Sequence, residues 1–172
     1  MKKLLYITNI CRGVSSFSVA AVRAAEELGV EFHLAGNFVG TTKESLRKNE
    51  KEYGVKLHQI DFIRTPYDLR NIKAYRQLVK LIKREKFDVI HCNTPIGGVL
   101  GRLVGKKCKV RKIIYQAHGF HFYKGAPKKN WLIYYPIEKW LAKYTDALIT
   151  INNEDYELAK SKFQLRHNGK VY

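Results

Sequence analysis

Polar and aromatic side chains gather in a glycine-containing segment at residues 115–127. The segment holds His118, His121 and Lys124, together with the aromatic residues Phe120 and Tyr123. Aromatic rings stack on the faces of sugar rings, while imidazole and amine groups form hydrogen bonds to hydroxyls or phosphates. The composition therefore indicates a binding site for a sugar or a sugar phosphate. His118 comes first after an apolar run, so we expect it to face the site.

A second segment suited to binding lies at residues 8–16, directly after the first apolar run. Gly13 precedes an expected helix, whose first N–H groups and positive dipole end attract anions, and Arg12 adds a charge. The segment matches neither GxGxxG nor GxxxxGK[ST], which argues against a nicotinamide-binding enzyme and a P-loop NTPase. On spacing alone, a glycine that only makes a turn is the favoured interpretation; the alternative is that the segment approaches a phosphate.

The positive charge is concentrated in the middle of the chain. The net charge is +17, and residues 61–150 hold 19 basic against 6 acidic side chains. Between Asp88 and Glu138 there is no carboxylate, while nine Lys and Arg residues occur from Arg102 to Lys129. A single, strongly positive stretch of surface is expected to attract nucleic acid, an anionic membrane or a diphosphate-bearing substrate. The alternative is a solvated face that only aids solubility.

Composition excludes several classes of protein. The hydrophobic fraction of 45% is enough for a core, and no apolar run approaches the roughly 20 residues that cross a bilayer. The opening apolar run is too short for a signal peptide. Cys11, Cys92 and Cys108 have the spacing of neither a disulfide framework nor a zinc site. We therefore expect a cytoplasmic protein in which these cysteines form neither a disulfide framework nor a zinc site.

Apolar runs alternate with helical patterns along the whole chain. Strands are expected at 4–7, 30–35, 55–60, 88–92, 112–117 and 146–151, and helices at 17–28, 41–54, 71–82, 97–104, 130–144 and 153–163. The expected N-caps are Ser15 or Ser16, Asn71 and Asn153, and Gly29 should end the first helix. This alternation predicts an α/β fold: a Rossmann-like, doubly wound parallel sheet in three layers. Ligands bind at the carboxyl ends of such strands, so the loops that start at Thr8, Asn93 and His118 should meet.

The helix expected after residue 130 is rich in aromatic residues. Its two Trp and two Tyr lie near lysines, which is the composition of a membrane-interface element. The alternative is that the rings belong to the core, and we expect this for at least half of them. Pro136 predicts a kink or break in the helix, and Pro66 interrupts the loop expected at 61–69. His33, His58 and His91 lie in strands, where we expect hydrogen-bonded core residues.

The chain resembles the bacterial GT-B glycosyltransferases of family 4, a group that includes capsular and exopolysaccharide sugar transferases. The resemblance covers nearly the whole chain. It rests on residues 94–102 (TPIGGVLGR), 118–127 (HGFHFYKGAP), 135–142 (YPIEKWLA), Thr145-Asp146 and 148–152 (LITIN).

The resemblance implies two Rossmann-like domains with a cleft between them. Residues 1–172 correspond to the N-terminal, acceptor-side domain, and the C-terminal donor-binding domain is absent, which fits the strand that begins near Gly169. The implied reaction is a retaining transfer without a metal or other cofactor, from a nucleotide-sugar such as a UDP-sugar to a lipid-linked saccharide. His118 matches the catalytic histidine, and Gly13 and Val14 match the loop at the donor phosphates. Substrate-binding side chains are expected at Arg12, Thr94, Phe120, His121, Tyr123 and Lys124.

These implications place the protein at the inner face of the cell membrane, as a peripheral protein that acts in polysaccharide synthesis. We expect the 172 residues alone to be inactive, and we expect no nucleic-acid partner. One alternative is a basic α/β module that binds nucleic acid, although no RNP, KH or zinc-finger pattern is present. The other is a self-sufficient nucleotide-binding enzyme of the Rossmann type, which the missing fingerprint disfavours.

Overall fold

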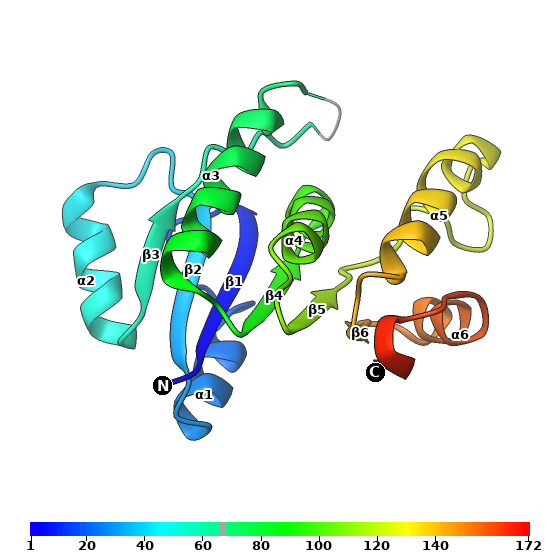
Figure 1. Cartoon of the computed structure of the whole chain (residues 1–172). Helices are drawn as coiled ribbons and strands as arrows, with labels where there is room; N and C mark the ends of the chain where they lie inside the picture. Colours follow the sequence, from blue (N-terminus) through cyan, green and yellow to red (C-terminus); the bar gives the residue numbers. More distant parts are fainter. Residues whose placement is uncertain (66–67) are drawn as a thin grey trace.

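The computed structural model describes residues 1–65 and 68–172, which form a seven-stranded sheet in which every pairing is parallel (Figure 1). The strand order is β3-β2-β1-β4-β5-β6-β7. The strands are β1 (Lys3–Ile10), β2 (Glu31–Asn37), β3 (Lys56–Gln59), β4 (Val89–Asn93), β5 (Lys112–Gln116), β6 (Ala147–Ile149) and β7 (Lys170–Val171). The doubly wound parallel sheet is therefore confirmed. Pro66 lies outside the described residues.

Helices cover both faces of the sheet. They are α1 (Val19–Glu27), α2 (Lys43–Tyr53), α3 (Asn71–Glu85), α4 (Pro95–Lys107), α5 (Lys128–Ala142) and α6 (Asn153–Lys162). The chain winds from β1 out to β3, crosses back to β4 and continues to β7, and right-handed crossovers place the helices of the two halves on opposite faces. Figure 1 shows α3 and α4 in front of the sheet, and α5 and α6 on the side of β6.

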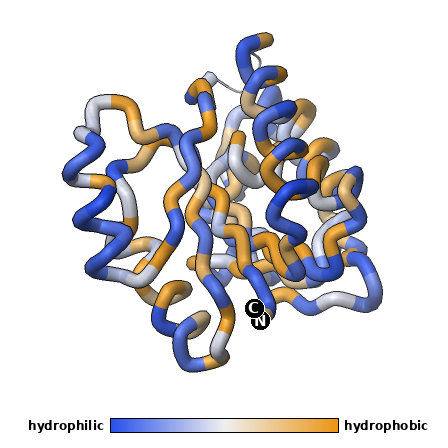
Figure 2. Tube along the Cα trace, turned by 60° about the vertical axis from the view of Figure 1, so that its left-hand side comes forward, coloured by the Kyte–Doolittle hydropathy of each residue, from blue (hydrophilic) through white to orange (hydrophobic). Residues whose placement is uncertain are grey.

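The core has two parts, one on each face of the sheet. In β1, Leu5 and Ile7 belong to the cluster shared with α3 and α4, while Tyr6 belongs to the cluster shared with α1. This alternation follows from the two-residue period of a strand. In Figure 2 the hydrophobic segments lie mainly along the strands in the interior, and hydrophilic residues dominate the outer turns. Strand β1 thus lies between two apolar layers.

Three predicted N-caps are displaced in the structure. The first helix begins after Ser18, not after Ser15 or Ser16, because Ser15 to Ser18 form a separate turn closed by the Ser18 hydroxyl. Asn71 is the first residue of α3, and its side chain instead binds the backbone of residues 63 and 65. The cap of α6 is Asn152, whose Oδ1 accepts from the Asp155 amide at 2.8 Å. Gly29 ends the first helix region with a φ of +62°, as predicted.

Helix α5 continues through Pro136, so the predicted break is wrong. The prediction for its aromatic rings is confirmed, because Trp131, Tyr134 and Tyr135 pack against the core while Trp140 is exposed. His33 and His58 are hydrogen-bonded to each other at 2.8 Å within the sheet, also as predicted. The predicted α4 was too short, since the helix runs over 13 residues.

Candidate functional site

The loops after β1, β4 and β5 meet at the carboxyl edge of the sheet, as predicted. Strands β1 and β4 are adjacent although they are not consecutive, so this edge contains the point where the winding direction reverses. Such a point is where open α/β sheets bind ligands. Here the His118 Nε2 atom lies 3.4 Å from Oδ1 of Asn93, which is buried at the end of β4. The fold thus brings together residues that are 25 positions apart.

Two cavities open at this edge. The first, the β1–β4 cavity, has a volume of about 590 Å³ and is lined by the loop after β1, the residues before α1 and the end of β4. The second, the α4–α5 cavity, has a volume of about 430 Å³ and lies between the start of α4, the loop after β5 and one side of α5. Thr94 and His118 line both cavities. The predicted catalytic histidine therefore stands in the wall that the two cavities share.

The imidazole of His118 is half-buried. The Phe17 ring meets it edge to face at a centroid distance of 5.6 Å. Burial lowers the pKa of His118 below its usual value of 6.5. At neutral pH the ring is therefore uncharged, with one nitrogen that donates and one that accepts a hydrogen bond.

Thr94 adopts an unusual backbone conformation at the N-terminus of α4. Its φ of +64° lies in the left-handed region that residues other than glycine rarely occupy. Its Oγ1 is buried and has no hydrogen-bond partner among the described residues. Strained backbone and unpaired polar groups of this kind occur preferentially at functional sites. The predicted binding role of Thr94 is consistent with this geometry.

Asn49 holds the loop that contains Gly13 and Val14. Gly13 has a φ of +118°, and a Cβ atom there would lie 2.6 Å from the Asn49 Oδ1 atom. The same oxygen accepts a hydrogen bond from the Val14 amide at 2.9 Å. Arg12 and Gly13 line the β1–β4 cavity, as expected for a phosphate-binding loop, whereas Val14 packs into the core beside α1. The Val14 amide is therefore already occupied, and nothing in the sequence indicated Asn49.

The loop after β5 alternates inward and outward residues. Phe120 and Phe122 are buried and stacked at a centroid distance of 4.8 Å. The backbone amide of Phe120 donates to the buried Asp155 carboxylate of α6 at 2.9 Å, which anchors the loop. Phe120 therefore belongs mainly to the core and borders the α4–α5 cavity, and its role in binding substrate stays a prediction.

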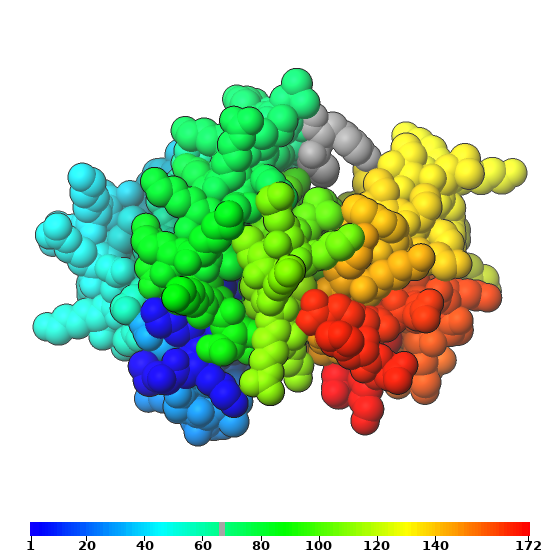
Figure 3. All heavy atoms as spheres, viewed as in Figure 1, coloured from blue at the N-terminus to red at the C-terminus, as the bar shows by residue number. Residues whose placement is uncertain are grey.

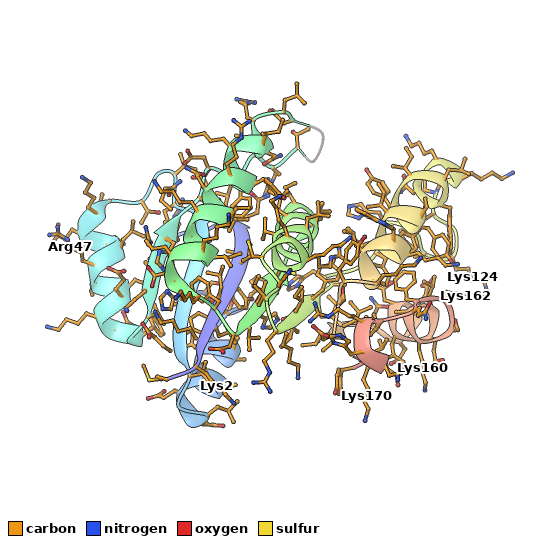
Figure 4. The ribbon with its side chains drawn as sticks, in the orientation of Figure 1. Lys2, Arg47, Lys124, Lys160, Lys162 and Lys170 are labelled. Atoms are coloured by element: carbon orange, nitrogen blue, oxygen red, sulfur yellow. The ribbon has the colours of Figure 1, made fainter. Side chains whose placement is uncertain are left out.

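Of the outward residues of this loop, one lies at the α4–α5 cavity and two lie on the outside of the molecule. His121 lines the α4–α5 cavity, with its ring 4.7 Å from that of Tyr134. Tyr123 and Lys124 line neither cavity, contrary to the prediction. Their backbone groups bind α5 and α6, through the Trp131 indole and the Glu154 carboxylate, and this directs the two residues to the outside. Figure 4 shows Lys124 at the outer edge of the molecule.

A buried ion pair forms one wall of the α4–α5 cavity. Arg102 of α4 donates to both carboxylate oxygens of Glu138 at 2.7 and 3.1 Å, and to the Gly98 carbonyl at 2.9 Å. Its guanidinium carbon lies 3.8 Å from the centre of the Tyr115 ring. Tyr115 and Glu138 face the cavity. One feature of the sequence pointed to Glu138: it is the first carboxylate after Asp88, fifty residues earlier.

The predicted single positive surface is divided by the fold. Arg102 is buried, and the basic residues from Lys106 to Lys112 lie where α4 ends and β5 begins. In a parallel sheet that is the edge opposite to the cavities. Lys124, Lys128 and Lys129 lie in the loop after β5 and the start of α5, and Arg47 of α2 lies at the opposite edge of the view from Lys124 (Figure 4). This distribution does not favour a continuous track for nucleic acid.

Within residues 1–65 and 68–172, no group of three or more metal-ligating side chains could hold an ion. Over the same residues, no helix has the length and apolar character of a membrane span.

Comparison with known proteins gives a consistent result. The sequence model described as "Glycosyl transferase 4-like" matches residues 14–152. The chain is 44% identical over 161 residues to "Putative glycosyltransferase EpsD" of Bacillus subtilis, covering 92% of this chain and 40% of that protein. It is 34% identical over 90 residues to an Escherichia coli UDP-Gal:alpha-D-GlcNAc-diphosphoundecaprenol alpha-1,3-galactosyltransferase, covering 52% of this chain and 23% of that protein. The chain therefore spans less than half the length of these relatives.

Solved structures share the fold at low sequence identity. An S. aureus MnaA–UDP structure superimposes with a TM-score of 0.70 at 17% identity, covering 99% of this chain and 44% of that one. The lipopolysaccharide outer core galactosyltransferase WaaB gives a TM-score of 0.60 at 16% identity, covering 98% and 44% of the two chains. The described residues thus correspond to less than half of each of these larger proteins.

Proposed function

Because this chain belongs to the glycosyl transferase 4-like family, we propose that it is the N-terminal, acceptor-side domain of a retaining sugar transferase. In this proposal a second α/β domain binds most of the nucleotide-sugar, and the cleft between the domains lies at the carboxyl edge of the sheet. The observation that carries the proposal is the position of His118, which lies between two cavities with different linings. A transferase needs two such sites, one for the donor and one for the acceptor.

We assign the β1–β4 cavity to the donor. Arg12 and Gly13 line it, and a cation beside a glycine backbone suits the diphosphate of a UDP-sugar. Departure of the nucleoside diphosphate places negative charge on its phosphates, which Arg12 would stabilise where that charge develops. Val14 would contribute its amide only after releasing Asn49. The assignment requires no metal ion.

We assign the α4–α5 cavity to the acceptor. Its lining is mostly apolar, with Glu138, Tyr115 and His121 as polar groups, which suits a sugar carried on a lipid diphosphate. The named substrate of the E. coli relative is a diphosphoundecaprenol-linked sugar, which supports this class of acceptor. The protein would then work at the inner face of the membrane in capsule or exopolysaccharide synthesis.

His118 would contact the donor sugar near the reacting carbon. With Nε2–H directed to Asn93, the uncharged imidazole can accept a hydrogen bond from a sugar hydroxyl at Nδ1 without repelling the positive charge that develops on the sugar ring. Asn93 would hold the ring through its Oδ1 atom. Thr94, whose hydroxyl is unpaired, would add a hydrogen bond to whichever substrate reaches the shared wall.

The test is a transfer assay with UDP-sugars and a polyprenyl-diphosphate-linked sugar acceptor. It compares this 172-residue chain with the longer protein that also contains a second α/β domain. We expect the longer protein to form a lengthened lipid-linked saccharide with the anomeric configuration of the donor retained, and the 172 residues alone to form none. Robust transfer by the 172 residues alone, or inversion of the anomer, would refute the respective part of the proposal.

A further inference from the structure

Helix α5 exposes apolar side chains on the outside of the molecule. Leu132 is 77% exposed, Ile133 44%, Ile137 37% and Trp140 47%. Successive residues of a helix are about 100° apart, so these four side chains and Pro136 fall within an arc of about 140°. The opposite side of the helix holds Leu141 and Ala142, which are buried. The five residues Leu132, Ile133, Pro136, Ile137 and Trp140 are called the α5 stripe below.

Lysines surround the α5 stripe. Lys129 and Lys143 fall within the same arc, near the two ends of the helix, and Lys128 and Lys139 flank it; all four are exposed. The single carboxylate of α5, Glu138, points to the other side and is bound to Arg102. Figure 3 shows α5, coloured yellow to orange, on the outer surface of the molecule. The stripe is therefore an apolar surface within a positive rim.

We propose that the α5 stripe docks on the surface of an anionic lipid bilayer. Apolar side chains enter the boundary between headgroups and acyl chains, and lysines around them bind lipid phosphates. Trp140 suits this position, because an indole ring favours the interface. The lysine rim selects an anionic membrane over a second copy of this chain, whose matching surface would carry the same charge.

The stripe also has a connection to the acceptor side. Ile137 belongs to the stripe and lines the α4–α5 cavity, and Tyr134 of the same helix lines the cavity one turn earlier. A helix lying on the membrane would therefore place the mouth of this cavity close to the lipid headgroups. This last step rests on the proposed function, whereas the docking itself does not.

The test is sedimentation of the 172-residue chain with phosphatidylcholine vesicles, with and without phosphatidylglycerol. The apolar variant Leu132→Ser/Ile133→Ser is compared with Leu28→Ser/Val39→Ser, whose two apolar residues are 76% and 64% exposed on other parts of the molecule. The charge variant Lys129→Gln/Lys143→Gln is compared with the α2 variant Lys48→Gln/Lys51→Gln. The two variants have the same net charge. Circular dichroism of every variant confirms the fold.

We expect the wild type to prefer the anionic vesicles. Each lysine near an anionic surface contributes about fivefold in binding, so the charge variant should bind about 30-fold more weakly. The apolar variant should bind at least about tenfold more weakly, and both controls should bind like the wild type. The proposal is overturned if the wild type does not bind the anionic vesicles, or if the α5 variants bind them as tightly as the wild type. It is also overturned if the control variants lose as much vesicle affinity as the α5 variants. A wild-type dimer that the apolar variant dissociates, without vesicle binding, would instead assign the stripe to a second copy.

Lipid binding and sugar transfer can fail separately. Failure of the wild-type chain to bind anionic vesicles, with transfer by the two-domain protein intact on a detergent-solubilised acceptor, would overturn the docking surface alone. Intact vesicle binding without transfer by the two-domain protein would overturn the proposed function alone.

Discussion

Replacing Glu138 by glutamine should destabilise the fold strongly, although this residue lies at the surface of a cavity. The Arg102 side chain is 1% exposed, and Glu138 accepts two of its three hydrogen bonds. A glutamine oxygen can replace only one of those acceptors, and it leaves the buried guanidinium without an opposite charge. Breaking a buried ion pair from one side costs about 3–5 kcal/mol.

Urea unfolding followed by circular dichroism measures this loss. With a slope of about 2–3 kcal/mol per molar urea, the midpoint should fall by about 1–2 M. The exposed Glu157→Gln is the matched control and should change stability by less than about 0.5 kcal/mol. The double variant Arg102→Met/Glu138→Leu removes both charges, so it should recover most of the loss. A loss below about 1 kcal/mol for Glu138→Gln would show that the Arg102 guanidinium does not depend on this carboxylate.

Three further predictions concern the core and the cysteines. Burial lowers the pKa of His91 to about 4. The unfolded chain therefore binds the proton first as the pH falls below about 6.5. Between neutral pH and about pH 4.5 the wild type should lose about 2.5 kcal/mol more unfolding free energy than His91→Gln; an equal fall of the urea midpoint in the two proteins would contradict this. Gly101→Ala should cost about 1–3 kcal/mol, because its Cβ would lie 2.5 Å from that of Cys92; an unchanged midpoint would show that the helix shifts freely. Burial raises the pKa of the Cys92 thiol to about 12, so in the folded protein iodoacetamide should label Cys11 and Cys108 but not Cys92, as read by mass spectrometry; equal labelling would contradict the burial.

The strand and helix order could be predicted because apolar runs and helical periods alternate clearly along the chain. The meeting of Asn93 and His118 followed from topology alone, since both follow parallel strands of one sheet. Helix starts were less predictable. Several polar residues compete for each cap, as Ser15 and Ser18 do, and tertiary hydrogen bonds decide between them.

The positions of residues at strand ends could be predicted from the sequence, whereas the positions of residues within loops could not. His118 and Thr94 lie at the two cavities because their positions follow directly from strand ends. Lys124 and Tyr123 do not, because hydrogen bonds to α5 and α6, which no local pattern reveals, set the direction of that loop. The charge pattern misled for a similar reason. Basic residues that are close in sequence were predicted to form one positive surface. The fold separates them, since those at the end of α4 and the start of β5 lie at the edge of the sheet away from the cavities.

The central claim is that His118 acts where two substrates meet. Its most direct test is the turnover of the two-domain enzyme with His118→Ala, compared with His167→Ala, an exposed histidine in neither cavity. We expect turnover to fall at least about a hundredfold for His118→Ala, with urea stability unchanged, and His167→Ala to behave like the wild type. Near-normal turnover of His118→Ala would remove His118 from the reaction.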